Sequence, residues 1–257
     1  MSIKLYYTEE YLREDALTLA SIVPDSQVSL FDAAMVVDEQ LYLLLNKDTL
    51  LLVSSLFKPF DLGLFYNEFI IKRKPGLKRE ILLQAINLKI GADELLEALD
   101  LTAGLGRDSI LMALAGFSVT MLENNPFLAI ILNYLSIDFH AQLKLTVQYI
   151  SNDKFLQTSK QKYHVIYFDP MFADGKNALA KKDMQLIDLM IKFVGDSAVV
   201  NNEEVFNLAR AHCLHKLVIK RDNKQQCLIS KPDPTYTKYG KTIRFDVYQS
   251  NLAKVCG

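Results

Sequence analysis

Cysteine is scarce in this chain of 257 residues, which holds only three: Cys213, Cys227 and Cys256. An odd number of cysteines without paired spacing fits reduced thiols better than a disulfide framework. Single cysteines of this kind usually serve as small buried hydrophobic residues. We therefore expect a protein of a reducing compartment, the cytoplasm.

An excess of either charge is also missing, since 29 Lys and Arg residues face 30 Asp and Glu residues and the formal net charge is −1. This balance excludes a strong global field toward phosphate or anionic lipid, so any contact with nucleic acid must use a local patch. No run reaches about 18 uninterrupted apolar residues, and residues 1–10 lack a basic region followed by an apolar run. We therefore expect neither a membrane span nor a secretion signal.

Hydrophobic residues are plentiful, at 50% of the sequence, which is enough for one α/β core and a smaller appended module. Residues 1–75 are predicted to form a small α+β module that consists mainly of β structure and begins with a helix over 11–20. Turn-forming residues divide the next apolar runs into strands over 33–37, 40–45 and 50–54. Residues 76–257 are predicted to form the main domain.

In this second part, apolar strand-like runs alternate with amphipathic helices, which is typical of a doubly wound parallel sheet of the Rossmann-like α/β class. The predicted strands are 95–101, 118–122, 145–150, 164–168 and 215–220, and the helices between them are 108–115, 127–139, 183–194 and 203–211. Two further β-like segments, 227–230 and 242–248, are expected to close the sheet as an antiparallel hairpin. Together these segments predict a mostly parallel sheet of seven strands.

A basic segment joins the two parts of the chain and leads into a helix predicted over 77–88. It is the best candidate for a local RNA-binding patch, because phosphate contacts need clustered Lys and Arg side chains. A solvated linker is the alternative interpretation. Its basic residues are Lys72, Arg73, Lys74, Lys78 and Arg79.

A glycine turn over 100–108 follows one predicted strand and precedes one predicted helix. Gly104 and Gly106 permit positive φ and a close approach of the backbone to a ligand. A tight turn without any ligand explains Gly-x-Gly equally well when it stands alone. A nicotinamide site is a further alternative, although its third glycine would fall at Ser109.

Glu123 follows the next predicted strand, 19 positions after Gly104. A carboxylate at this point of the fold can accept hydrogen bonds from both hydroxyls of a ribose. Asn124, Asn125 and Pro126 then open a helix, Asn125 as an N-cap candidate and Pro126 in the first turn. Asn124 is free to contact an adenine.

The fourth predicted strand runs into Asp169-Pro170-Met171-Phe172, which resembles the Asp-Pro-Pro-Tyr/Phe motif of amino-methyltransferases. An aromatic exocyclic amine is a poor nucleophile and must be held in line with the methyl group, roughly 3–3.5 Å away. Asp169 and the Pro170 carbonyl can accept its two hydrogens. Phe172 can stack on a flipped base. These three are the predicted catalytic residues.

Taken together, the motifs resemble those of the RsmJ family, guanine 2-amino methyltransferases of bacterial small-subunit (16S) ribosomal RNA. They are the segments 102–108, 123–126, 169–172, 218–221 and 244–246. The resemblance implies a class I methyltransferase fold, S-adenosyl-L-methionine as methyl donor, no metal, and the small subunit or its RNA as partner. Beside Gly104 and Gly106, the cofactor contacts that it implies are Arg107, Asp108, Glu123, Asn124, Ser151, Asn152 and Asp169.

This sequence departs from the family pattern in two places. The family often has Glu-Arg-Asn-Pro where residues 123–126 of this chain are Glu-Asn-Asn-Pro, so that Asn124 replaces the arginine. The basic segment of the family is also usually richer in glycine than the one in this chain. Two other functions stay open: an amino-methyltransferase acting on DNA or a free amine, and a catalytically silent RNA-binding module. The intact Asp169 and Phe172 disfavour the silent module. The near-neutral charge and the lack of a target-recognition domain disfavour a DNA enzyme.

Overall fold

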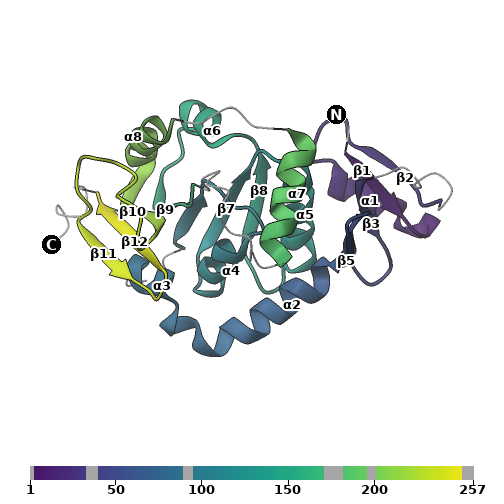
Figure 1. Ribbon diagram of the computed structural model, residues 1–257, viewed down its shortest axis with the longest axis horizontal. Coiled ribbons are helices and arrows are strands. Elements are labelled where there is room, and N and C mark those ends of the chain that lie inside the picture. Colours follow the sequence, from purple (N-terminus) through teal and green to yellow (C-terminus); the bar gives the residue numbers. More distant parts are fainter. Residues whose placement is uncertain (1–2, 33–39, 89–94, 171–181, 196–200, 251–257) are drawn as a thin grey trace.

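The computed structural model describes residues 3–32, 40–88, 95–170, 182–195 and 201–250 (Figure 1). A five-stranded sheet and a seven-stranded sheet lie side by side, with helices packed between and around them (Figure 1). No helix among the described residues is long and apolar enough to cross a lipid bilayer.

The smaller sheet has the strand order β2-β1-β3-β4-β5. Its strands are β1 (Lys4–Tyr7), β2 (Gln27–Leu30), β3 (Leu41–Leu45), β4 (Leu50–Ser54) and β5 (Phe57–Asp61). β3, β4 and β5 form an antiparallel meander, while β1 lies parallel to both β2 and β3. The 3-10 helix η1 (Glu10–Leu12) and α1 (Arg13–Ala20) make the crossover that parallel strands require. The strand predicted over 33–37 lies outside the described residues.

The larger sheet has the order β11-β12-β10-β9-β6-β7-β8. Its strands are β6 (Glu97–Asp100), β7 (Ser118–Glu123), β8 (Leu145–Tyr149), β9 (Tyr163–Phe168), β10 (Cys213–Asp222), β11 (Tyr236–Tyr239) and β12 (Ile243–Gln249). The strands from β6 to β10 are parallel, and β12 lies antiparallel to β10 and β11. The mostly parallel seven-stranded sheet with a C-terminal hairpin is therefore confirmed.

One strand of that hairpin was predicted at the wrong place. Residues 227–230 form no strand, and the partner of β12 is β11, after the two prolines at 232 and 234. Proline lacks the N–H that a sheet ladder needs, so the segment that contains the two prolines stays irregular and the strand begins after them. The aromatic and β-branched residues of β11 suit a strand better than a loop.

The helices of the larger part are α4 (Arg107–Leu114), α5 (Pro126–Asp138), α6 (Asn152–Thr158), α7 (Lys182–Val194) and α8 (Asn202–His212). Before them, α2 (Leu62–Arg73) leads into the 3-10 helix η2 (Lys74–Arg79) and then α3 (Ile81–Ile86). The helix predicted over 77–88 is thus shorter at both ends, because α3 begins at Ile81 and ends at Ile86. Glu80 has an extended backbone, with φ −65° and ψ 125°, and this interrupts the helical path before Ile81.

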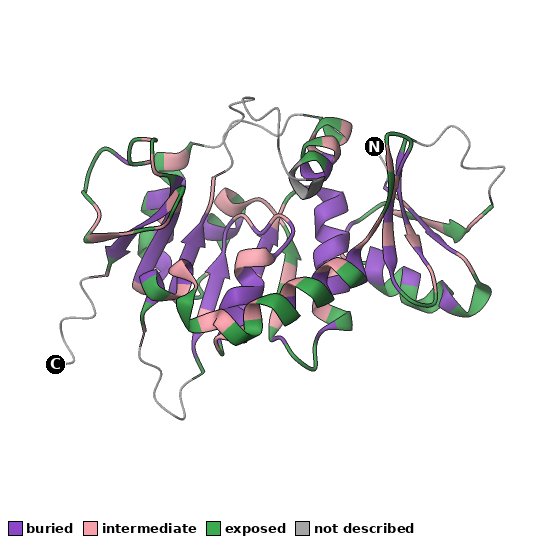
Figure 2. Ribbon diagram, turned by 60° about the horizontal axis from the view of Figure 1, so that its bottom comes forward, coloured by how far each residue is buried: buried purple, intermediate pink, exposed green. Residues whose placement is uncertain are grey.

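α5 joins the hydrophobic cores of the two sheets. It is buried on almost all sides and contacts α1, α2, α7 and β8. A helix that is apolar all round belongs inside a protein. One continuous buried cluster accordingly includes Leu5 and Leu43 from the small sheet and Val119 and Ile130 from the large part. Figure 2 shows the buried strands, with the outer side of α2 exposed.

Candidate active site

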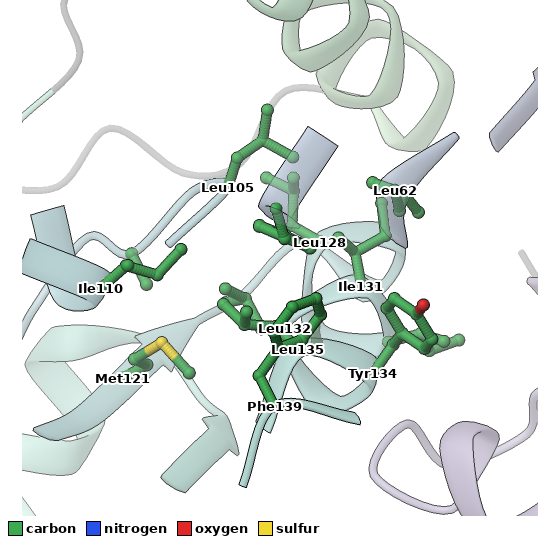
Figure 3. Packing of buried hydrophobic residues seen from close by; sticks show 14 of the residues in the cluster. Leu62, Leu105, Ile110, Met121, Leu128, Ile131, Leu132, Tyr134, Leu135 and Phe139 are labelled. Carbon is green, nitrogen blue, oxygen red and sulfur yellow. The ribbon is translucent and has the colours of Figure 1, made fainter. Parts of the chain in front are cut away.

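The glycine turn connects β6 to α4, and its two glycines have different neighbours. Gly104 and Gly106 both adopt left-handed backbone conformations, with φ of +56° and +74°. A Cβ on Gly106 would lie 2.9 Å from the Cδ2 atoms of Leu132 and Leu135 on α5, whereas a Cβ on Gly104 would meet nothing within 4 Å. Figure 3 shows these leucines packed below Leu105. Gly106 is therefore required by packing, and the space beside Gly104 is open to a ligand.

Glu123 ties the end of β7 to this turn. Its Oε2 accepts a hydrogen bond of 3.0 Å from the backbone N–H of Gly104, and its Oε1 accepts bonds of 2.9 and 2.8 Å from the N–H groups of Asn124 and Asn125. Burial raises the pKa of Glu123 to about 7, against the opposing effect of these bonds. The side chain is only partly buried, and Oε2, which accepts one bond, can accept a further bond from a ribose hydroxyl.

Asn125 is the N-cap that the sequence predicts for α5. Its Oδ1 accepts from the backbone N–H groups of Phe127 and Leu128, and Pro126 occupies the first helical position. The amide of Asn125 also donates to the carbonyl of Met190 on α7. Asn124 is exposed and thus remains able to meet a ligand, as predicted for the adenine side.

Asp100 lies below the turn with a side chain that is 1% exposed. Its Oδ2 accepts a bond of 2.6 Å from the Ser109 hydroxyl, and its Oδ1 accepts one of 3.1 Å from the Thr102 N–H. Burial, with a smaller contribution from the carboxylates of Asp108 and Asp169, raises its pKa to about 7. Ser109, which stands where a nicotinamide site would have its third glycine, is instead a partner of Asp100.

Asp108 and Asp169 face each other across the ammonium group of Lys220. The Nζ atom of Lys220 lies 2.8 Å from Asp108 Oδ2 and 2.9 Å from Asp169 Oδ2. The Tyr167 hydroxyl also donates to Asp108 Oδ2, at 2.6 Å. Burial, opposed by Lys220, raises the pKa of Asp169. Burial alone would lower the pKa of Lys220, but the two carboxylates outweigh it and raise that pKa.

The end of β9 is anchored to the glycine turn. The backbone N–H of Asp169 donates a bond of 2.8 Å to the Thr102 hydroxyl, so Asp169 is held close to the residue that opens the turn. Asp169 and Pro170 are both partly exposed at this edge of the sheet. Phe172, the third predicted catalytic residue, lies outside the described residues.

Ser151 and Asn152 follow β8 at the same edge. The amide nitrogen of Asn152 donates to the Leu101 carbonyl at 3.3 Å, which brings the start of α6 to the end of β6. The Oδ1 atom of Asn152 is buried without a hydrogen-bond partner. Because a buried acceptor left unpaired is costly, this atom fits a ligand that brings a donor, such as an adenine amine. Ser151 is the N-cap residue of α6 and is partly buried.

The basic segment shows a division among its five side chains. Arg73 pairs with Glu80 at 2.8 Å and lies over the Phe69 ring, so its guanidinium is already engaged. The other four, Lys72, Lys74, Lys78 and Arg79, are exposed. η2 packs against α4, the helix that Arg107 begins after the glycine turn. Arg107 itself is partly buried.

The predicted cofactor residues therefore meet at the carboxyl ends of β6, β7, β8 and β9, where open α/β sheets bind ligands. Sequence reasoning about the site did not include three residues that the structure adds: Thr102, Tyr167 and Lys220. Lys220 belongs to a segment that resembles the family pattern, which was the available signal. No group of three or more His, Cys, Asp or Glu side chains within the described part of the chain is arranged to hold a metal ion.

The charges at this edge suit a cationic cofactor. Asp100, Asp108 and Asp169 carry up to three negative charges, and Lys220 offsets one of them. S-adenosylmethionine carries a positive sulfonium and a positive amino group, so an excess of carboxylates attracts it. The open space at Gly104, the unpaired Asn152 oxygen and the partly exposed Glu123 carboxylate fit its adenosine part.

Comparisons with known proteins agree with this geometry. A family model described as "Putative SAM-dependent methyltransferase" matches residues 32–250. The protein named Ribosomal RNA small subunit methyltransferase J in Legionella pneumophila (strain Lens) is 33% identical over 238 residues, which cover 86% of this chain and 93% of that protein. The protein of the same name in Coxiella burnetii (strain RSA 331 / Henzerling II) is 34% identical over 179 residues, 67% of each chain.

Among solved structures, the SAM-dependent methyltransferase NGO1261 from Neisseria gonorrhoeae matches with a TM-score of 0.65 and 20% sequence identity, over 96% of both chains. This likeness confirms the methyltransferase fold. The cofactor is S-adenosylmethionine, as the sequence predicts. The extent and identity of the sequence matches show the family: the chain belongs to the RsmJ family of S-adenosylmethionine-dependent methyltransferases.

Proposed function

We propose that this enzyme methylates the exocyclic 2-amino group of a guanine in the 16S RNA of the small ribosomal subunit. The observation that carries the proposal is the position of Asp169 and Pro170 at the end of β9, beside the carboxylate-lined edge that receives the cofactor. Relatives named as small-subunit ribosomal RNA methyltransferases support the choice of substrate. Such a substrate would place the enzyme in the cytoplasm.

The chemistry at Asp169 follows from what its side chain has available. Its Oδ2 is engaged by Lys220, which leaves Oδ1 to accept one hydrogen of the guanine amine. The Pro170 carbonyl would accept the other hydrogen, so that the amine lone pair is directed away from both. Bound S-adenosylmethionine supplies an electrophilic methyl group. The amine becomes acidic as it is methylated, and Asp169 can accept the released proton during or after the transfer.

The remaining predicted residues take supporting roles in this proposal. Phe172 would stack on the flipped guanine, and the basic residues of η2 and the end of α2 would hold RNA phosphates without reading the base sequence. Gly104, Gly106, Arg107, Asp108, Glu123, Asn124, Ser151 and Asn152 would bind the cofactor. We also propose a division at residue 75 into a small module and a catalytic domain, although α2 packs on α4 and α5.

The test is methyl transfer to small subunits from a bacterial strain that lacks its own RsmJ, with mass mapping of the modified base. Asp169→Asn keeps the shape but removes the charge, and single-turnover transfer should be slowed by ~10²-fold or more. Asp188→Asn, an exposed carboxylate on α7, is the matched control and should transfer at the normal rate.

Calorimetry should show that the Asp169→Asn variant still binds the cofactor. Normal transfer by that variant would contradict the catalytic assignment. Modification of DNA or a free amine in place of the subunit would establish the first alternative function. Tight RNA binding by the unaltered enzyme without any transfer would favour the silent module.

A further inference from the structure

Lys220 reaches the site because of the order of strands in the large sheet. β10 lies parallel to β9, with Ile219 opposite Phe168, so Lys220 is next to Asp169 at the same edge. Val218 is opposite Tyr167, and Tyr167 is opposite Asp100 on β6. Because side chains alternate between the faces of a sheet, Lys220 shares the face of Tyr167 and Asp100, the face that α4 covers with Asp108 and Ser109.

The two ion pairs of Lys220 each use one particular oxygen. Lys220 contacts Oδ2 of Asp108 and Oδ2 of Asp169, and the Tyr167 hydroxyl shares the former. Among the described residues no ion pair or hydrogen bond engages either Oδ1 atom, so both are available to ligands. The Asp169 carboxylate cannot turn freely, since its Oδ2 is bound to the ammonium and its backbone N–H to Thr102.

We propose that Lys220 is a positioning residue for methyl transfer, which fixes the Asp169 carboxylate with Oδ1 toward the substrate amine and couples it to the cofactor-binding carboxylate of Asp108. The inference rests on the proposed function, because the reaction assigned to Asp169 is the one that Lys220 would serve. Lys220 itself contacts neither the amine nor the methyl group in this assignment.

A second effect of Lys220 is to favour the ionised form of Asp169. Asp169 is surrounded by titratable and charged groups: Asp100 from β6, Tyr167 from β9, Asp108 from α4, and Lys220 and Arg221 from β10. Burial and the neighbouring carboxylates favour its neutral form, while Lys220 is the larger opposing charge. Without Lys220, the pKa of Asp169 must therefore rise further, because an adjacent opposite charge is lost.

Lys216 provides a contrast on the same strand. It is buried, whereas Lys220 is partly exposed, and its ammonium donates to the carbonyl of Ile86 at 2.6 Å and to the Tyr236 hydroxyl at 2.9 Å. These contacts attach β10 to α3 and β11, away from the paired carboxylates. Lys216 is thus a buried lysine on β10 with a purely structural role. It therefore serves as the matched control for Lys220.

The first measurement needs no methyl transfer. Carboxyl ¹³C NMR of aspartate-labelled enzyme would follow the titration of Asp169, assigned by its absence in Asp169→Asn. In Lys220→Met the midpoint should move upward by ~1 pH unit or more, whereas Lys220→Arg should leave it near the original value and Lys216→Met should not move it. An unchanged midpoint in folded Lys220→Met would overturn the proposal.

The second measurement is single-turnover transfer to unmodified small subunits as a function of pH. Lys220→Met should be slowed at least tenfold at pH 7, with its acid limb displaced upward and the apparent substrate affinity little changed, and Lys220→Arg should recover most of the rate. A loss in Lys220→Met with an unshifted pH profile would overturn the positioning role. If the original enzyme modifies no subunit while the NMR midpoint still shifts, the proposed function fails and the Lys220 bridge stands.

Discussion

The backbone N–H of Gly104 donates a 3.0 Å hydrogen bond to the carboxylate of Glu123, which joins the glycine turn to the strand that follows it. The bond links two residues 19 positions apart that the sequence assigns to the same cofactor. Glu123 is thereby fixed with three N–H partners and has no need of a side-chain partner. Its Oε2 keeps one acceptor position for a hydroxyl group of the ligand.

Cofactor affinity should depend on pH through Glu123. Because burial raises the pKa of Glu123 to about 7, the carboxyl is mostly neutral at pH 6 and mostly ionised at pH 8. The ionised form accepts hydroxyl bonds better and attracts a cation, so the affinity for S-adenosylmethionine should rise roughly tenfold over this range. Calorimetry on Glu123→Gln should show a weaker affinity for the cofactor, and this affinity should change little with pH.

Asp100 supplies the control for that experiment, since burial raises its pKa to about 7 as well. Asp100→Asn should retain the rise in affinity if Glu123 causes it. If the affinity of Asp100→Asn did not change with pH while that of Glu123→Gln rose normally, Asp100 and not Glu123 would be the cause of the pH dependence.

The two glycines of the turn should respond differently to alanine. Gly106→Ala combines left-handed strain with a Cβ 2.9 Å from two leucines and should lower the free energy of unfolding by ~2–4 kcal/mol. Gly104→Ala carries only the strain, ~1–2 kcal/mol, but fills space at the predicted ligand position. Urea unfolding and cofactor titration of both variants should therefore rank them in opposite orders. Equal losses of stability would contradict this division.

The hairpin should depend on the buried pair of Arg244 and Asp246. Their side chains are 6% and 1% exposed and lie 3.0 Å apart, and Arg244 also donates to the carbonyls of Asp222 and Gln225. Arg244→Met removes the ion-pair partner of the buried Asp246 and should cost ~3–5 kcal/mol of unfolding free energy. Arg13→Met, at an exposed pair, should change it by less than ~0.5 kcal/mol.

A double variant checks the cause. Arg244→Met with Asp246→Leu removes both charges and should lose less stability than Arg244→Met alone. A larger loss in the double variant would show that the contacts of Arg244 to the backbone, and not the ion pair, hold the hairpin.

RNA binding should depend on the exposed basic residues more than on Arg73. Replacing Lys72, Lys74, Lys78 and Arg79 with Ser should weaken binding to the small-subunit RNA and flatten its salt dependence, by up to ~0.7–0.9 in the log–log slope for each lost phosphate contact. Arg73→Ser should have little effect on that slope, because Arg73 is paired with Glu80. Cofactor affinity should stay unchanged in both variants, and an unaltered slope in the fourfold variant would exclude this surface.

The elements whose signals are local could be predicted from the sequence alone. Gly104 and Gly106 between a strand and a helix, Glu123 after the next strand, and Asp169-Pro170 after β9 each lie at the carboxyl end of a parallel strand, so their meeting at one edge follows from the alternating pattern. The Asn125 cap of α5 is equally local, because an N-cap satisfies its own helix.

The residues that complete the site from distant parts of the chain depend on how the chain folds. Lys220 is far from Asp108 and Asp169 in the sequence, and it reaches both because β10 pairs with β9 and α4 covers the same face of the sheet. Likewise, the position of β11 was decided by its pairing with β12. Periodicity and spacing carry no information on strand order or on contacts across helices, since these depend on how the buried surfaces of the whole chain fit together.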